Sequence, residues 1–163
     1  MIWLFLACVH RLGEVDHSLA PPFTAVQLHD AFPAGTDVRF RRTTDGQTVI
    51  LHWVFESPTD DGVSIRATVE RPDGTFLYDD GAHFERWAEL VQHAVFPAAA
   101  TTIEEGSVTV AAGTYPVRTY VVRGADGTIE RFSFAPTLPG PPVFYTKTVG
   151  GVEVVRMELV ERR

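Results

Sequence analysis

The sequence has 163 residues, of which 45% are hydrophobic and 21% are charged, and 21 acidic against 14 basic side chains give a net charge of -7. A chain of this length fits one ordinary domain, and folding would bury roughly 70% of its unfolded surface without disulfide support. The acidic balance argues against a nucleic-acid-binding protein, which needs a basic face. The composition also excludes a disordered chain, a collagen and a coiled coil.

The first residues differ from the rest of the chain. An unbroken apolar run, residues 2–7, leads into Cys8, the only cysteine, so no intrachain disulfide can form. A small residue followed by cysteine after an apolar stretch resembles the lipobox of bacterial lipoproteins, in which the signal is cleaved before the cysteine and the thiol receives a lipid. This resemblance implies lipidation of Cys8 and membrane attachment through an N-terminal acyl anchor alone.

The apolar run is shorter than a signal core of roughly 7–15 residues, and no Lys or Arg precedes Cys8, so we interpret the run as a truncated signal. The alternative is an apolar leader or strand with an incidental cysteine. Residues 9–22 lack periodicity, end in two prolines and are predicted to be a tether. We therefore divide the chain into a signal and tether, residues 1–22, and one packed domain, residues 23–163.

A short helix is predicted to open the packed domain, with Thr24 as its cap and Pro33 as its stop. Strands follow, because alternating apolar runs are separated by turn dipeptides such as Asp45-Gly46 and Asp126-Gly127. Asp-Gly is a strong hairpin signal, since glycine readily adopts the positive φ that these turns need. The predicted strands are residues 37–44, 47–56, 63–71, 75–78, 107–111, 115–123, 128–134, 143–149 and 152–161.

One longer helix is predicted over residues 84–96. The apolar side chains of this segment, with Trp87 near its centre, repeat at the spacing of one helical stripe. Asp80 is the expected cap, and residues 97–106 are expected to form a loop. This helix would be the natural cover for one face of a sheet.

The strand patterns predict which faces are buried. Residues 63–70 alternate cleanly between apolar and polar, whereas residues 49–56 and 115–122 are apolar on both faces. Two-sided central strands together with a helix favour a mainly β (α+β) fold. We expect a curved antiparallel sheet of about nine strands, half-barrel-like, covered by one long and one short helix. A flat sandwich of two equal sheets fits less well, because it gives the helix no role.

Two turn motifs carry a family resemblance. Residues 112–117 (AGTYPV) open a strand, and residues 138–143 (LPGPPV) connect two strands. This pattern resembles uncharacterised bacterial envelope lipoprotein domains and, more distantly, LolA/LolB-like half-barrels that shelter lipid chains. The resemblance implies a concave apolar face with helices as a lid. It concerns turns and prolines, and therefore implies a fold rather than an activity.

The sequence holds no motif for a catalytic or metal site. There is no Gly-x-Ser-x-Gly elbow, phosphate-binding loop, dinucleotide glycine fingerprint or His-Glu-x-x-His, and no two of the six histidines have a metal-binding spacing. Asp79, Asp80 and His83 are explained as residues near a helix start. We therefore expect no enzyme activity, catalytic residue, metal or cofactor.

Three polar side chains, His52, Arg118 and Tyr120, lie on the less apolar faces of otherwise apolar strands. They are the candidate ligand-binding residues, because a few polar groups in an apolar concavity suit a small-molecule or lipid site. The alternative is a polar network under the helix, satisfied by its own hydrogen bonds.

Two functions compete at this point. The first is a non-catalytic cell-envelope lipoprotein domain that shields a lipid or another apolar ligand between sheet and helix. The alternative is a structural or protein-interaction module of the envelope, with a filled core and no small ligand. The expected location is the cell envelope, or the cytoplasm if the N-terminal segment is not a signal. Nucleic acid is not an expected partner, and the sequence leaves the oligomeric state open.

Overall fold

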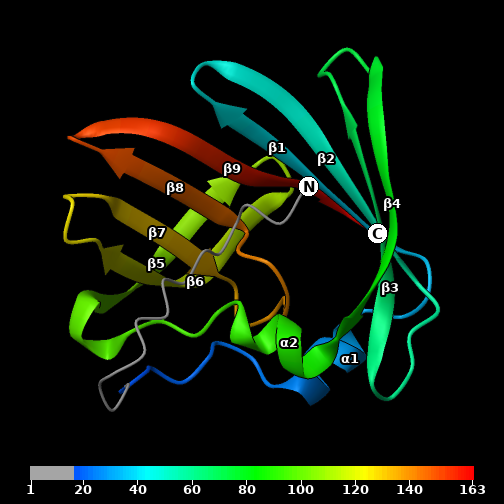
Figure 1. Cartoon of the computed structure of the whole chain (residues 1–163), viewed down its shortest axis with the longest axis horizontal. Helices are drawn as coiled ribbons and strands as arrows, with labels where there is room; N and C mark the ends of the chain where they lie inside the picture. The colour runs from blue at the N-terminus through cyan, green and yellow to red at the C-terminus, as the bar shows by residue number, and fades with distance from the viewer. Residues whose placement is uncertain (1–16) are drawn as a thin grey trace.

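Nine antiparallel strands form one continuous sheet in the computed structural model, which describes residues 17–163 (Figure 1). The strands are β1 (Thr36–Thr44), β2 (Gln47–Glu56), β3 (Gly62–Glu70), β4 (Phe76–Arg86), β5 (Thr101–Val110), β6 (Gly113–Arg123), β7 (Ile129–Phe134), β8 (Phe144–Val149) and β9 (Val152–Arg162). Their order across the sheet is β4-β3-β2-β1-β9-β8-β7-β6-β5. Within the described chain β4 and β5 do not pair with each other, so the sheet is curved but unclosed. The predicted fold class is confirmed.

Tight hairpin turns fix the register of neighbouring strands. Asp45 and Gly46 both have positive φ, 49° and 78°, as a two-residue type I′ turn requires, and Thr44 pairs with Gln47 across it. Gly150 and Gly151 make the equivalent turn between β8 and β9, with φ of 58° and 83°. The turn dipeptides therefore determine these hairpins locally, as the sequence predicts.

Helix α1 (Ala25–Ala31) forms where the sequence predicts it. The Gln27 backbone N–H donates to Thr24 Oγ1 at 3.2 Å, and the Thr24 backbone N–H donates to Gln27 Oε1 at 2.9 Å. This reciprocal capping box satisfies two donors that a helix start otherwise leaves unpaired. The helix ends at Ala31, two residues before Pro33.

The predicted long helix over residues 84–96 is wrong in length. Helix α2 spans only Trp87–Gln92, and β4 continues to Arg86. Asp80 therefore lies within a strand, and no side chain caps α2. The physical reason is the backbone ladder with β3, in which Val63 pairs with Glu85. Helix propensity is a weak preference, and pairing along a whole strand overrides it.

The expected loop over residues 97–106 is also wrong. A 3-10 turn, η1 (Ala98–Ala100), leads directly into β5, which pairs with β6 along its whole length, from Thr101 opposite Val122 to Val110 opposite Gly113. Many β5 side chains are exposed, so the segment carries little hydrophobic periodicity. Its strand conformation comes from pairing with β6.

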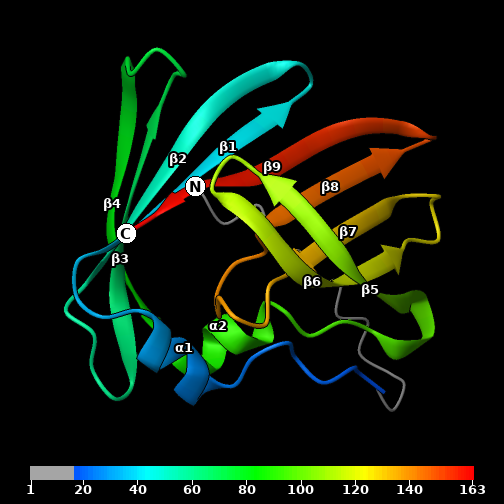
Figure 2. The same cartoon turned by 180° about the vertical axis from the view of Figure 1, so that it is seen from behind.

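The sheet has an inner face, defined here as the face over which α1 and α2 lie. The two helices contact each other and lie together at one end of the molecule in both views (Figures 1 and 2). Figure 2 shows the β5–β6 hairpin crossing over β7, β8 and β9. At its tip the Ala112 backbone N–H donates to the Leu159 carbonyl at 3.3 Å, which ties the hairpin to β9.

Candidate functional site

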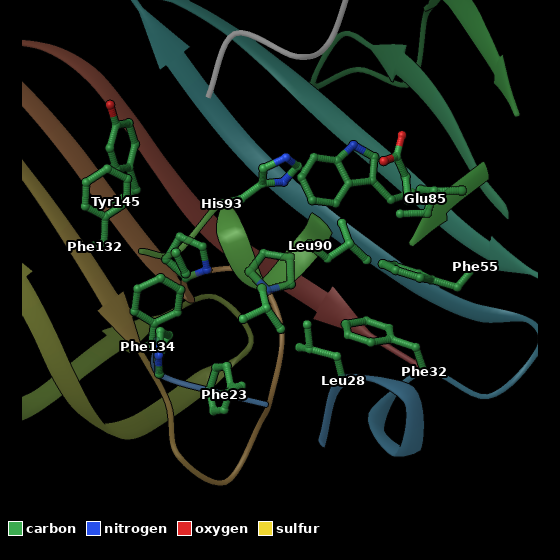
Figure 3. Close-up of a pocket in the computed structure, with 18 of the residues that line it drawn as sticks. Phe23, Leu28, Phe32, Phe55, Glu85, Leu90, His93, Phe132, Phe134 and Tyr145 are labelled. Carbon is green, nitrogen blue, oxygen red and sulfur yellow. The ribbon is translucent and has the colours of Figure 1, made fainter. Parts of the chain in front are cut away.

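A cavity of about 230 Å³ lies between the two helices and the inner face of the sheet (Figure 3). The strand residues of its wall are Trp53 and Phe55 on β2, Ile65 and Ala67 on β3, Asp80, His83 and Glu85 on β4, Phe132 and Phe134 on β7, Tyr145 on β8 and Met157 on β9. Alternation along each strand brings these side chains to the same face. The wall is thus mainly aromatic and aliphatic.

The helices cover this cavity without filling it. Leu28 from α1 and Leu90 and Val91 from α2 line it. In Figure 3 Leu90 lies between two groups of aromatic side chains, with Phe55 on one side and Phe134 on the other. Helix α2 is only six residues long, against thirteen in the predicted helix over residues 84–96.

Trp87, which the sequence places at the centre of the covering helix, serves a different purpose. Its side chain is 3% exposed and does not line the cavity. The indole N–H donates to the Thr59 carbonyl at 2.9 Å, and the Trp87 backbone N–H donates to the Asp61 carbonyl at 3.1 Å. These bonds fix the start of α2 to the β2–β3 loop, so Trp87 positions the lid.

Four acidic or histidine side chains contribute to the cavity wall: Asp80, His83, Glu85 and His93. His83 is exposed although it lines the cavity, which places it where the cavity meets solvent. Burial lowers the pKa of His93, and nearby Glu89 acts in the opposite direction. The neutral imidazole of His93 is therefore favoured relative to an exposed histidine.

Glu85 is the most buried of these four groups, with 9% of its surface exposed. Burial raises the pKa of the Glu85 carboxyl, the negative charge of Glu89 raises it further, and His83 lowers it. A carboxylate in such a place lacks the solvation that water would give its charge. The free energy of the folded state is therefore sensitive to the protonation of Glu85.

We expect Glu85→Gln to raise the free energy of unfolding at pH 8 but not at pH 4. Since the pKa of Glu85 is raised on folding, ionisation opposes folding, and this penalty is fully present only above the folded pKa. Below the ordinary glutamate pKa of about 4.3 both states bind the proton, and the penalty vanishes. Urea unfolding of both proteins across this range measures the difference.

Glu104→Gln is the matched control, because Glu104 is exposed and pairs with Arg131 at 3.0 Å. Losing an exposed pair changes stability by less than about 1 kcal/mol and gives no gain at pH 8. A Glu85→Gln protein that gains no stability between pH 4 and pH 8 would show that the carboxylate is well accommodated in the wall.

Two further polar groups of the wall, the Tyr145 hydroxyl and the Trp53 indole N–H, differ in their hydrogen bonding. The Tyr145 hydroxyl donates to Glu130 Oε1 at 2.6 Å, and burial, the main cause, raises the pKa of Tyr145. The Trp53 indole N–H is buried and has no hydrogen-bond partner among residues 17–163. The Trp53 N–H is therefore a buried donor that the described part of the protein does not pair.

The three ligand-binding residues that the sequence suggests lie apart from the cavity. The His52 side chain is on the outer face of β2, with Nε2 2.9 Å from Asp37 Oδ2. Arg118 is exposed and pairs with Glu105 at 3.2 Å. Tyr120 is 2% exposed and packs in the core, with its ring centroid 5.0 Å from that of Phe96. None of the three lines the cavity. Arg118 and Tyr120 interact with each other on β6, whereas His52 lies apart from them on β2.

Sequence reasoning missed Glu85, His93 and Trp53 as cavity residues. Alternation along the sequence does not point to Glu85, because a register shift opposite Ala67 and Thr68 changes which residues of β4 face inward. The helical spacing of residues 84–96 also concealed the strand. Cys8, the predicted lipidation site, lies outside the described residues.

The described chain contains neither a metal-binding cluster nor a membrane-spanning helix. Residues 17–163 contain no group of three or more His, Cys, Asp or Glu side chains placed to hold a metal ion. No helix within the same range has the length and apolar character needed to span a bilayer.

Comparison with known proteins adds information about the fold. No protein-family model matches the sequence, and no curated protein matches it significantly. A solved structure of MucB is similar, with a TM-score of 0.54 and 14% sequence identity. The similarity covers 85% of this chain but only 56% of the MucB chain, so the present sequence spans about half of that protein. At this identity the likeness shows a shared fold and nothing about a shared ligand.

Proposed function

We propose that this protein is a non-catalytic domain of the cell envelope that shelters a lipid chain or another apolar ligand between its helices and the inner face of its sheet. The observation that carries the proposal is the cavity of about 230 Å³ with a mainly aromatic and aliphatic wall. An engineered apolar cavity of about 150 Å³ already binds benzene. Ligand sites are typically concave and apolar with a few polar groups, which is the composition of this wall.

The location in the envelope depends on the N-terminal pattern. The apolar run that ends in Ala7-Cys8 supports a lipid anchor on Cys8. The fold shared with MucB supports a half-barrel architecture, in which a curved sheet carries a lid of helices. Neither observation identifies the ligand, so the cavity itself must be tested.

We expect the uncharged dye N-phenyl-1-naphthylamine to bind the protein with a rise in fluorescence, and Ala67→Phe to weaken this binding at least tenfold. Ala67 is 6% exposed and lines the cavity from β3, so a phenyl ring in its place occupies the space that the dye needs. A tenfold loss corresponds to about 1.4 kcal/mol of binding free energy. Fluorescence titration gives the dissociation constants.

Ala82→Phe is the matched control, because Ala82 is exposed on β4, pairs with Arg66 on the outer face and does not line the cavity. It should leave dye affinity unchanged. Urea unfolding checks that both variants are folded. Equal dye affinity in the wild-type protein and a folded Ala67→Phe variant would contradict the proposal.

A second candidate, an interaction module without a small ligand, is favoured by one observation. Phe76, Leu77 and Tyr78 on the edge strand β4 are 62%, 39% and 48% exposed. An edge strand with exposed apolar side chains can add a strand from a partner protein. Failure of the wild-type protein to bind the dye would favour this candidate.

A further inference from the structure

The carboxylates of the cavity wall are not balanced by permanently positive side chains among the lining residues of 17–163. Asp80 and Glu85 line the cavity, whereas none of the lining residues within 17–163 is Lys or Arg. The two lining histidines do not supply a permanent positive charge at neutral pH, and burial favours the neutral form of His93. A ligand with a carboxylate or phosphate head would therefore meet acidic groups with no fixed cation to receive it.

Glu85 is the most buried of the acidic side chains that line the cavity. Glu85 has 9% of its surface exposed and lines the cavity, and no hydrogen bond within residues 17–163 contributes to the pKa of its carboxyl. The charged neighbours that influence it are Glu89 on α2, which repels a second negative charge, and His83 on β4. A buried carboxylate without a cationic partner raises the free energy of the folded protein. A cation brought by the ligand would remove that cost.

The cavity also separates polar from apolar surface. In Figure 3 Glu85 lies on the Phe55 side of Leu90, whereas Phe132 and Phe134 lie on the opposite side. An elongated amphiphile could thus place its head at Glu85 and its chain toward Phe134.

We propose that the ligand of this cavity is a cationic amphiphile, an alkyl chain that carries a protonated amine, and that the Glu85 carboxylate receives the amine. The inference rests on the proposed function, because it assigns a ligand class to the same cavity. Glu85 acts as a selectivity residue, which discriminates amines from acids of equal chain length. The apolar wall supplies affinity that is common to all such ligands.

Competition against bound N-phenyl-1-naphthylamine at pH 8 tests the proposal, with dodecylamine, dodecanoate and dodecanol as competitors below their aggregation concentrations. Dodecylamine is charged at this pH, since alkylamines ionise near the lysine pKa of about 10.4. We expect it to bind at least tenfold more tightly than dodecanoate. We expect Glu85→Gln to reduce that ratio to about one.

Glu89→Gln is the matched control, because Glu89 is exposed on α2 and does not line the cavity. It should retain the preference for the amine. Equal affinities for dodecylamine and dodecanoate in the wild-type protein would overturn the inference while leaving the proposed function intact, provided that the dye binds. Dodecanol binding as tightly as dodecylamine would also overturn it, since affinity would then not depend on the charge of the head group. No dye binding at all would reject both proposals.

Discussion

Phe96→Ala is expected to lower the free energy of unfolding by about 3–5 kcal/mol, the usual cost of truncating a buried phenylalanine. Phe96 is 3% exposed, and its ring centroid lies 5.0 Å from that of Tyr120 and 4.9 Å from that of Phe132. Removing the ring leaves a void beside an aromatic cluster on two strands. Urea unfolding of the wild-type protein and the variant measures the loss.

The position of Phe96 in the chain adds to this effect. It follows α2, so its ring anchors the end of the covering segment to the inner face, and its carbonyl accepts a hydrogen bond from the Leu19 N–H at 2.8 Å. Val26→Ala, at a side chain that is 68% exposed on α1, is the control and should change stability by less than about 0.5 kcal/mol. A loss below about 1 kcal/mol for Phe96→Ala would show that Phe96 does not anchor the lid.

The parts of the fold that could be predicted are those that local chemistry determines. Asp45 and Gly46 adopt the positive φ that their residue types favour, and this turn sets the register of β1 against β2. Thr24 and Gln27 form a capping box from residues three positions apart. In each case the residues that make the interaction lie within a few positions of each other, so the sequence contains the whole signal.

The lid and the cavity could not be predicted in the same way. Phe84 fits a helical stripe with Trp87, but it also fits a strand, and the long-range pairing of β4 with β3 decides between the two. In the protein Phe84 is 53% exposed, so its apolar character does not report burial. Glu85 reaches the cavity only because β4 replaces the first turn of the expected helix.

The predicted binding residues illustrate a second limit. Alternation in β2 separates His52 from Trp53, but both faces of this strand carry apolar residues, so the pattern does not show which face is the inner one. The pairing of β2 with β3 and the position of α1 determine that Trp53 and Phe55 face the cavity. Tyr120 is on the inner face, but Phe96 covers it.

Gly62→Ala is expected to destabilise the protein by about 1–3 kcal/mol, the usual range for an overpacked site. A Cβ atom at this position would overlap the carbonyl oxygen of Glu85 and lie 2.9 Å from the Cα atom of Arg86. Both are backbone atoms at the end of β4, so relief requires movement of the strand itself. Gly62 therefore permits the close approach that places Glu85 at the cavity and lets Trp87 begin α2.

Gly106→Ala is the matched control, because a Cβ atom at Gly106 on β5 would have no heavy atom within 4 Å and this glycine does not have positive φ. It should be neutral or stabilise the protein by up to about 1 kcal/mol, since alanine restricts the unfolded chain. Urea unfolding compares the two variants.

Because Gly62→Ala displaces the backbone of Glu85, we also expect this substitution to reduce the preference for dodecylamine over dodecanoate. A Gly62→Ala protein as stable as Gly106→Ala, with the preference intact, would show that the end of β4 adapts freely and that its close contact with β3 does not position Glu85.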